Sequence, residues 1–313
     1  MELVINPSLT NLIKVFNESY KDDYPEDFTK WSLDYFELYY IKTSWFRWEL
    51  LNALSINDSI EAYVILDPRL ISGEGAVYTQ ALCIKRRPFR YWAANALLDL
   101  IEFKSRELGA RKLVIHLRYV SPLRQLLLER GYFVTDKWCR MSVKLNRLHP
   151  VLREVKGFTI KPYVDGVDDG VLIRIHNEVF SEEEGFIPLD EERLRIMKNS
   201  ESWSRTRIYF IQTEEGDTVG LASYVIKKDG KVLIEAIGIR KGFRGRGLGK
   251  YLLNYVLNET KELGYDLAYL FVTASNKPAM NLYISTGFKV DYLGLTLTKV
   301  VTNAPVVTAS LKP

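Results

Sequence analysis

The hydrophobic positions of residues 158–300 follow two different periods along the chain. Short apolar runs typical of β-strands occupy 158–162, 207–212, 219–226, 232–239 and 267–273. Apolar residues recur every three to four positions around 168–180, 189–198, 248–263 and 278–286, which predicts helices there. Alternating residues after Phe288 predict two last strands, and Asp229-Gly230 predicts a hairpin between two earlier ones. The mixture predicts an α/β (mixed α+β) domain.

The same order of elements recurs in the first half of the chain, displaced by about 155 residues. Three pairs of segments carry the match: 106–109 with 261–264, 122–132 with 278–288, and 82–90 with 237–244. The repeat predicts two tandem copies of one fold, with a domain at 1–150 and a second at 151–313. A polar linker is expected at 146–157, and 302–313 is expected to be a loosely held tail.

A basic, glycine-rich turn joins the strand that ends at Ile239 to a helix that opens at Gly247 or Leu248. A strand, a glycine turn and a helix N-terminus together present several free N–H groups in one concavity, and the helix dipole adds positive charge. The turn therefore predicts a diphosphate site. Its spacing fits neither the P-loop pattern G-x-x-x-x-G-K-[ST] nor the dinucleotide pattern G-x-G-x-x-G.

Two motifs resemble the signatures of the GCN5-related N-acetyltransferase (GNAT) superfamily. The first is Arg-x-x-Gly-x-Gly, with Arg244, Gly247 and Gly249. The second is Asn-x-x-Ala-x-x-Leu-Tyr-x-x-x-Gly-Phe, which runs from Asn276 to Phe288. Both stand in the family's order with its usual gap. The resemblance covers residues 158–300 and implies, for each copy, a mixed, mostly antiparallel central sheet flanked by helices.

The resemblance also implies a cofactor site for acetyl-CoA. No metal site is expected, because the three histidines, His116, His149 and His176, lie far apart in the sequence. The backbone of Ile237, Gly238 and Ile239 would bond the pantetheine arm, and Asn276 would contact it. The N–H groups of the turn and the first helical residues would hold the diphosphate: Arg244, Gly245, Arg246, Gly247, Leu248, Gly249 and Lys250. Asn276 also fits a second interpretation, the N-cap of the helix that follows it.

Two catalytic residues follow from the same resemblance. Tyr283 is the expected general acid that protonates the leaving thiolate, the alternative being a packed core tyrosine. Glu235 interrupts a strand that we expect to be apolar and buried on both faces, where a lone carboxylate is costly. Its family position implies a general base, and the alternative is a structural carboxylate. Glu182, Glu183 and Glu184 would border the acceptor cleft, where they suit a cationic amine or form a solvated loop.

The first copy lacks these features and is interpreted as degenerate and structural. Arg90, Tyr91 and Trp92 begin the segment that replaces the glycines, and its tryptophan and alanine side chains would fill the diphosphate space. Leu127 replaces the tyrosine, and Val120 or Ser121 replaces the asparagine. The first copy is expected to pack against the second as a pseudo-dimer.

Composition and charge limit the partners and the cellular compartment that we expect for this protein. The 313 residues carry a formal net charge of +4, with fifteen Lys/Arg against five Asp/Glu between 85 and 147, and six against thirteen in 1–75. Pairing of these opposite charges is favoured over a nucleic-acid partner, because no nucleic-acid motif accompanies them. No signal peptide or membrane segment is found, and Cys83 and Cys139 are expected to be reduced core thiols. We expect a cytoplasmic protein.

The resemblance implies an acyltransferase that moves an acetyl group from acetyl-CoA to a primary amine by direct attack on the thioester. The acceptor would be a small-molecule amine or a protein amino group, and the protein a monomer or a homodimer. One alternative is a non-catalytic acyl-CoA-binding or sensor module. Another is a different acyl-CoA donor, or a small thiol-precursor acceptor as in mycothiol synthases, whose plan of one degenerate and one working copy is similar.

Overall fold

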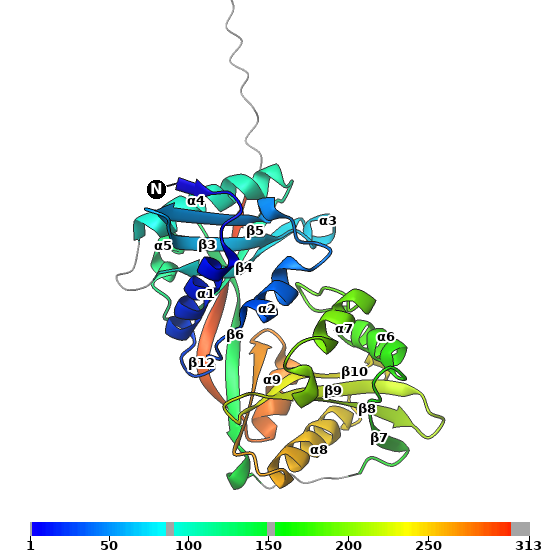
Figure 1. Cartoon of the computed structure of the whole chain (residues 1–313). Helices are drawn as coiled ribbons and strands as arrows, with labels where there is room; N and C mark the ends of the chain where they lie inside the picture. Colours follow the sequence, from blue (N-terminus) through cyan, green and yellow to red (C-terminus); the bar gives the residue numbers. More distant parts are fainter. Residues whose placement is uncertain (1, 86–90, 149–153, 302–313) are drawn as a thin grey trace, which may run out of the picture. The chain divides into compact units, whose positions relative to one another are not determined.

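A computed structural model describes residues 2–85, 91–148 and 154–301, which divide into two compact units (Figure 1). Unit 1 comprises Met1–Thr135 and Leu295–Pro313, and unit 2 comprises Asp136–Gly294. The described residues 136–148 and 295–301 therefore fall in different units from those expected of contiguous halves at 1–150 and 151–313. The expected tail at 302–313 and the middle of the expected linker, 149–153, lie outside the described residues.

Unit 1 builds a sheet in the order β1-β2-β3-β4-β5-β12. Its strands are β1 (Glu2–Val4), β2 (Leu51–Ile56), β3 (Ser59–Asp67), β4 (Ala76–Ile84) and β5 (Lys112–Arg118), with the second half of β12. Its helices are α1 (Leu9–Asp23), α2 (Leu33–Phe36), α3 (Ile71–Glu74), α4 (Tyr91–Glu107) and α5 (Leu123–Glu129). One buried cluster joins the sheet to α4 and α5, and a second joins it to α1 and α2.

Unit 2 repeats this plan, with its sheet in the order β6-β11-β10-β9-β8-β7. Its strands are β7 (Phe158–Pro162), β8 (Thr206–Thr213), β9 (Thr218–Ile226), β10 (Val232–Ile239) and β11 (Leu267–Thr273), and most of β6 (Phe133–Lys144) lies in it. Its helices are α6 (Asp169–Phe180), α7 (Glu191–Lys198), α8 (Leu248–Glu262) and α9 (Lys277–Ser285). One buried cluster packs against α8 and α9, and the other against α6 and α7.

The last strand of each repeat contributes to the other unit. β6 follows α5 in the chain, yet its residues 138–144 pair antiparallel with β11 of unit 2. β12 (Lys289–Val300) follows α9, yet its residues from Leu295 onward belong to unit 1, where Val301 donates its N–H to the Arg111 carbonyl at 2.9 Å. Such an exchange of equivalent elements is the intramolecular form of domain swapping. It is the physical reason why the compact units are not contiguous halves.

The mixed α/β architecture expected from the sequence is confirmed. The pairs β4–β5 and β10–β11 are parallel, and the remaining described pairings are antiparallel. The expected strand at 158–162 has these same bounds in β7, and the Asp229-Gly230 hairpin is present, with Gly230 in a left-handed conformation at φ +80°. The expectation of two strands after Phe288 is wrong, because β12 is one strand of 12 residues.

Candidate active site in unit 2

The site begins where two parallel strands part. β10 and β11 pair at Val232 and Leu233 only, whereas β10 stays paired with β9 as far as Ile239. The register of β10 against β9 shifts between Ile234 and Ala236, so Glu235 is the extra residue of a β-bulge. A bulge bends its strand and disrupts the ladder locally. The backbone of β10 beyond the bulge is therefore an edge without a β11 partner.

The glycine turn follows this open edge. Gly245 and Gly247 both adopt left-handed φ angles of +79°, and Gly247 is the N-cap residue of α8. These angles suit glycine and disfavour side chains with a Cβ. Among the described residues, no acceptor bonds the N–H groups of the six successive residues from Gly245 to Lys250. The first turn of any helix leaves about four such donors unpaired, so this turn extends an ordinary helix terminus into a longer run of donors.

The end of α6 closes the other side of the turn. Gly238 can lie against α6 because it has no side chain: a Cβ there would stand 1.9 Å from Val179 Cγ1. Arg244 ties the same elements together, donating to the carbonyls of Ile239 at 2.9 Å and Val179 at 3.3 Å. Its guanidinium also pairs with Glu182 at 3.0 Å. Arg244 therefore positions the turn against α6 and β10.

These elements enclose a cavity of about 480 Å³. Eleven of the thirteen predicted site residues line it: Ile237, Gly238, Ile239, Arg244, Gly245, Gly247, Leu248, Gly249, Lys250, Asn276 and Tyr283. Glu235 and Arg246 do not, and the Arg246 guanidinium instead stands 5.0 Å from the Phe243 ring centroid. Sequence reasoning missed the apolar wall, made by Val179, Phe180, Phe243, Pro278, Ala279 and Leu282.

Tyr283 is buried beside this cavity. Its side chain is 8% exposed, and its ring lies 5.8 Å from that of Phe288. Burial raises the pKa of its hydroxyl to about 12, and the Glu183 carboxylate contributes to the shift. The phenol therefore keeps its proton at neutral pH. A protonated hydroxyl that faces a cavity can donate its proton to a leaving group there.

Asn276 is the N-cap residue of α9, as one of the two interpretations of this residue predicted. Its side-chain oxygen accepts the Ala279 N–H at 3.2 Å, and Pro278 occupies the first turn. The residue also lines the cavity. Capping and a contact to a ligand are compatible, because the cap uses the oxygen of the carboxamide.

The surroundings of Glu235 differ from those expected. The strand is not buried on both faces at this point, since Glu235 is exposed at the bulge and the next three residues are partly exposed. The nearby protein still desolvates the carboxyl and raises its pKa above the usual range, an effect that Lys227 partly offsets. The expectation of a buried carboxylate in a fully apolar strand is therefore corrected: the bulge brings Glu235 to solvent at the parting of the strands.

The described part of unit 1 contains the counterpart of this opening. β4 and β5 pair from Ala76 to Tyr78 and then part, leaving a pocket of about 160 Å³. Leu127, at the position of Tyr283, is fully buried. Residues 86–90, including Arg90, lie outside the described residues, and α4 already begins at Tyr91. Trp92 is 39% exposed on α4, so its expected role as a filler of the diphosphate space stays a prediction.

Other features of the described residues bear on the expected chemistry. Cys83 and Cys139 are buried and free of disulfide bonds. No group of three or more metal-ligating side chains gathers within the described ranges. No helix of those ranges is long and apolar enough to cross a membrane.

The parting strands, the glycine turn and the buried phenol of this cavity all lie between residues 172 and 288. Residues 172–288 match the model of the Acetyltransferase (GNAT) family. The segment that this model covers is a GNAT-family acetyltransferase domain. Unit 2 contains all of the matched residues.

Relatives of known name share part of this chain. It is 26% identical over 229 residues to a mycothiol acetyltransferase of Thermomonospora curvata. The aligned region covers 72% of this chain and 69% of the relative. It is 29% identical over 133 residues to a mycothiol acetyltransferase of Streptomyces avermitilis. This aligned region covers 42% of this chain and 43% of that relative. The second match spans less than half of the relative's length.

Solved structures share the fold over nearly the whole chain. A GCN5-related N-acetyltransferase from Sphaerobacter thermophilus aligns with a TM-score of 0.69 at 18% identity, covering 96% of each chain. A tandem GNAT protein from the clavulanic acid biosynthesis pathway aligns with a TM-score of 0.70 at 13% identity, covering 97% of this chain and 99% of that one. At these identities the likeness is one of fold.

Proposed function

We propose that this protein is an acetyl-CoA-dependent N-acetyltransferase whose unit 2 moves an acetyl group to the primary amine of a small molecule. The observation that carries the proposal is the run of six N–H groups from Gly245 to Lys250, which find no acceptor among the described residues and border a cavity that Tyr283 also lines. A run of N–H donors at a helix N-terminus suits a diphosphate. A buried phenol beside it suits proton donation to a thiolate.

The binding roles follow from this arrangement. The N–H groups of the turn would bond the diphosphate, and Lys250 would add positive charge beside it. The open edge of β10 from Ile237 to Ile239 would bond the amides of the pantetheine arm, because these residues line the cavity and have no β11 partner. The apolar wall formed by Phe180, Phe243 and Leu282 would cover the arm and keep water from the thioester.

The chemical roles complete the proposal. The acceptor nitrogen forms the new amide bond while the carbon–sulfur bond of the thioester breaks. Glu235 would take the proton that the nitrogen loses, directly or through a water, because its raised pKa brings the carboxylate nearer to the basicity that such a transfer needs. Tyr283 would donate its proton to the leaving thiolate and regain one from solvent.

The acceptor is proposed as a small-molecule amine. The relatives reported above are named mycothiol acetyltransferases, and these names favour a small acceptor over a protein amino group. A non-catalytic acyl-CoA-binding module remains the alternative of another class. It would bind the cofactor in the same cavity without turnover.

Calorimetric titration of acetyl-CoA into the full chain, followed by an assay of free thiol release with a mixture of small amines, tests the proposal. One site per chain together with amine-dependent thiol release is the expected result. Binding without release would favour the non-catalytic module. Absence of binding would overturn the placement of acetyl-CoA in unit 2.

A further inference from the structure

Three successive glutamates, Glu182 to Glu184, follow α6. Of these, Glu183 lines the cavity and is not paired with a described cation. The Glu182 carboxylate is committed to Lys241 at 2.7 Å and to Arg244 at 3.0 Å. Glu184 does not line the cavity. Glu183 does, and no hydrogen bond or ion pair to another described residue holds its carboxylate.

Glu183 and Tyr283 face the same space. Both line the cavity, and the hydroxyl of Tyr283 has no hydrogen-bond partner among the residues that the structure describes. The negative charge of Glu183 helps to raise the pKa of that hydroxyl to about 12, after the larger effect of burial. Such an effect requires the carboxylate to lie near the phenol. The Glu183 carboxylate and the group proposed to meet the leaving sulfur therefore border one cavity.

The charge of Glu183 is only partly offset by its neighbours. Desolvation raises the pKa of the Glu183 carboxyl, and Arg244 opposes this rise. The guanidinium of Arg244 is already bonded to Glu182 and to the carbonyls of Ile239 and Val179. The Glu183 side chain is exposed at the edge of the cavity that it lines. A carboxylate without its own partner there gains a charge-assisted hydrogen bond when a cation binds beside it.

We infer that Glu183 is a specificity-determining residue, which draws the acceptor into the cavity of unit 2 by pairing with its ammonium group. The inference rests on the proposed function and narrows it to acceptors that are cationic when they bind. The turn that carries Glu183 is fixed at both ends, since Glu183 donates its N–H to Phe180 and accepts the N–H of Phe186. Glu183 thereby differs in role from Glu235, which lies at the bulge and does not line the cavity.

The test uses the full chain saturated with CoA and three pairs of probes. Each pair matches an amine with the compound in which a hydroxyl replaces the amine: 1,4-diaminobutane with 1,4-butanediol, glycinamide with glycolamide, and glucosamine with glucose. Binding is measured by calorimetry in wild type, Glu183→Gln and Glu183→Asp. Glu184→Gln is the matched control, because it removes a neighbouring charge that does not line the cavity.

The expected result is that at least one amine binds about tenfold more tightly than its alcohol in wild type. Glu183→Gln should bring that ratio to near one, Glu183→Asp should retain part of it, and Glu184→Gln should leave it unchanged. A wild-type protein that binds CoA but shows no preference for any amine would overturn the inference and leave the cofactor site standing. An unchanged ratio in Glu183→Gln would overturn it too. Loss of CoA binding itself would instead count against the proposed function.

Discussion

The two units share one backbone plan and differ in what occupies the opening between their parallel strands. In unit 2 the parting of β10 and β11 leads to a cavity of about 480 Å³, bordered by backbone N–H groups and apolar side chains. In unit 1 the parting of β4 and β5 leads to a pocket of about 160 Å³, lined by polar side chains such as Gln80, His116 and Arg118. The same opening is therefore a larger, mostly apolar cavity in unit 2 and a smaller, more polar pocket in unit 1.

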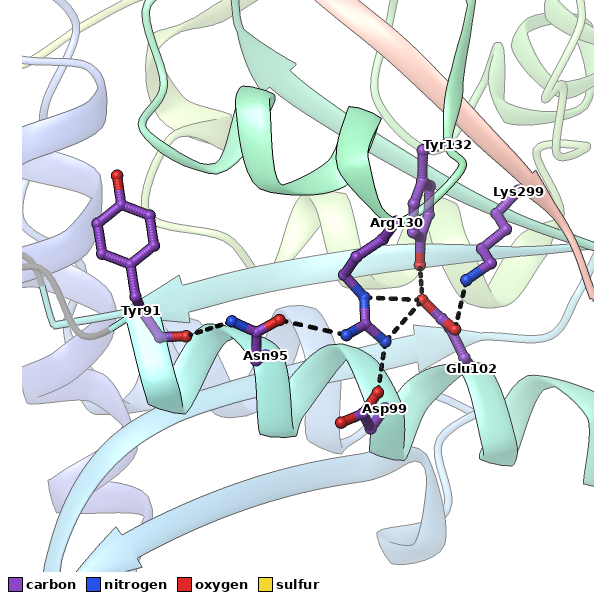
Figure 2. Close-up of polar contacts among 7 residues, drawn as sticks. All are labelled: Tyr91, Asn95, Asp99, Glu102, Arg130, Tyr132 and Lys299. Carbon is purple, nitrogen blue, oxygen red and sulfur yellow. Dashed lines mark hydrogen bonds and ion pairs between the residues drawn. The ribbon is translucent and has the colours of Figure 1, made fainter.

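The helix beside each opening shows a second difference. Figure 2 shows that Arg130, at the end of α5, reaches Asn95, Asp99 and Glu102 on α4. The Glu102 carboxylate, 6% exposed, also accepts from Tyr132 at 3.2 Å and pairs with Lys299 of β12 at 2.6 Å. By the repeat offset, the positions of Glu102 and Tyr132 correspond in unit 2 to Leu257 and Phe288, which are buried in its apolar core.

This second difference lies in the contacts that hold α4 and α8 to their sheets. α8 packs on its sheet mostly by apolar contacts, and its Glu259 accepts from the hydroxyls of Tyr209 and Tyr224. The N–H groups of its first turn have no acceptor among the described residues. α4 is held by a polar network that also fastens the exchanged strand β12. Unit 1 thus has a polar network around Glu102 where unit 2 has the apolar Leu257 and Phe288, and unit 2 has the run of backbone N–H groups that we propose to bind the cofactor.

Removing the hydroxyl of Tyr283 should lower the rate most. Tyr283→Phe keeps the ring against Phe288 but removes the proton donor, so kcat should fall by about 10²–10⁴ while acetyl-CoA binds as before. Tyr255→Phe is the control, because that ring packs on Tyr209 outside the cavity. Thiol release under steady-state conditions measures both. An unaltered kcat in Tyr283→Phe would mean that the tyrosine is a packed core residue, like Leu127 in unit 1.

The pH dependence should identify Glu235 by its acid limb. Because desolvation raises the pKa of Glu235, its carboxylate form and the rate should both decrease as pH falls through that raised value. Tyr283, with a pKa of about 12, stays protonated below that pH and should add no alkaline limb. Glu235→Gln should lower the rate by about 10²–10³ and remove the acid limb. An acid limb that persists in Glu235→Gln would assign the base to another group.

The parts of this contrast that were predictable from sequence are those set by local chemistry. The glycine turn, Asn276 and Tyr283 belong to contiguous motifs, and the structure places all of them on one cavity. The strand exchange was not predictable, because β6 and β12 each follow the helix that the repeat requires and their pairing partners lie far away in sequence. The bulge at Glu235 was missed as well, since its register depends on β9 and not on the residues of β10.

Breaking the polar network of unit 1 should cost stability without removing the cofactor site. Glu102→Gln removes the charge that faces Arg130 and Lys299, and these two side chains are themselves mostly buried. We expect a loss of about 2 kcal/mol in the free energy of unfolding, below the value for a fully buried pair because both cations retain some solvent. Hydrogen exchange at β5 and β12 should report it. Asp99→Asn, at an exposed side chain, is the control and should change little.

Gly247→Ala should give the smallest effect and the sharpest test of where the cofactor binds. The φ angle of +79° at Gly247 costs a residue with a Cβ about 1 kcal/mol, and no neighbouring atom would crowd the new methyl group. The strain acts on the turn whose N–H groups are proposed to hold the diphosphate, so acetyl-CoA should bind about five- to tenfold more weakly, still at one site per chain. Gly242→Ala, in the same segment but without a left-handed φ, should bind as wild type does. Two sites per chain, with the weaker one unaffected by Gly247→Ala, would show that the smaller opening in unit 1 also accepts the cofactor, and the contrast between a binding unit and a structural unit would then fail.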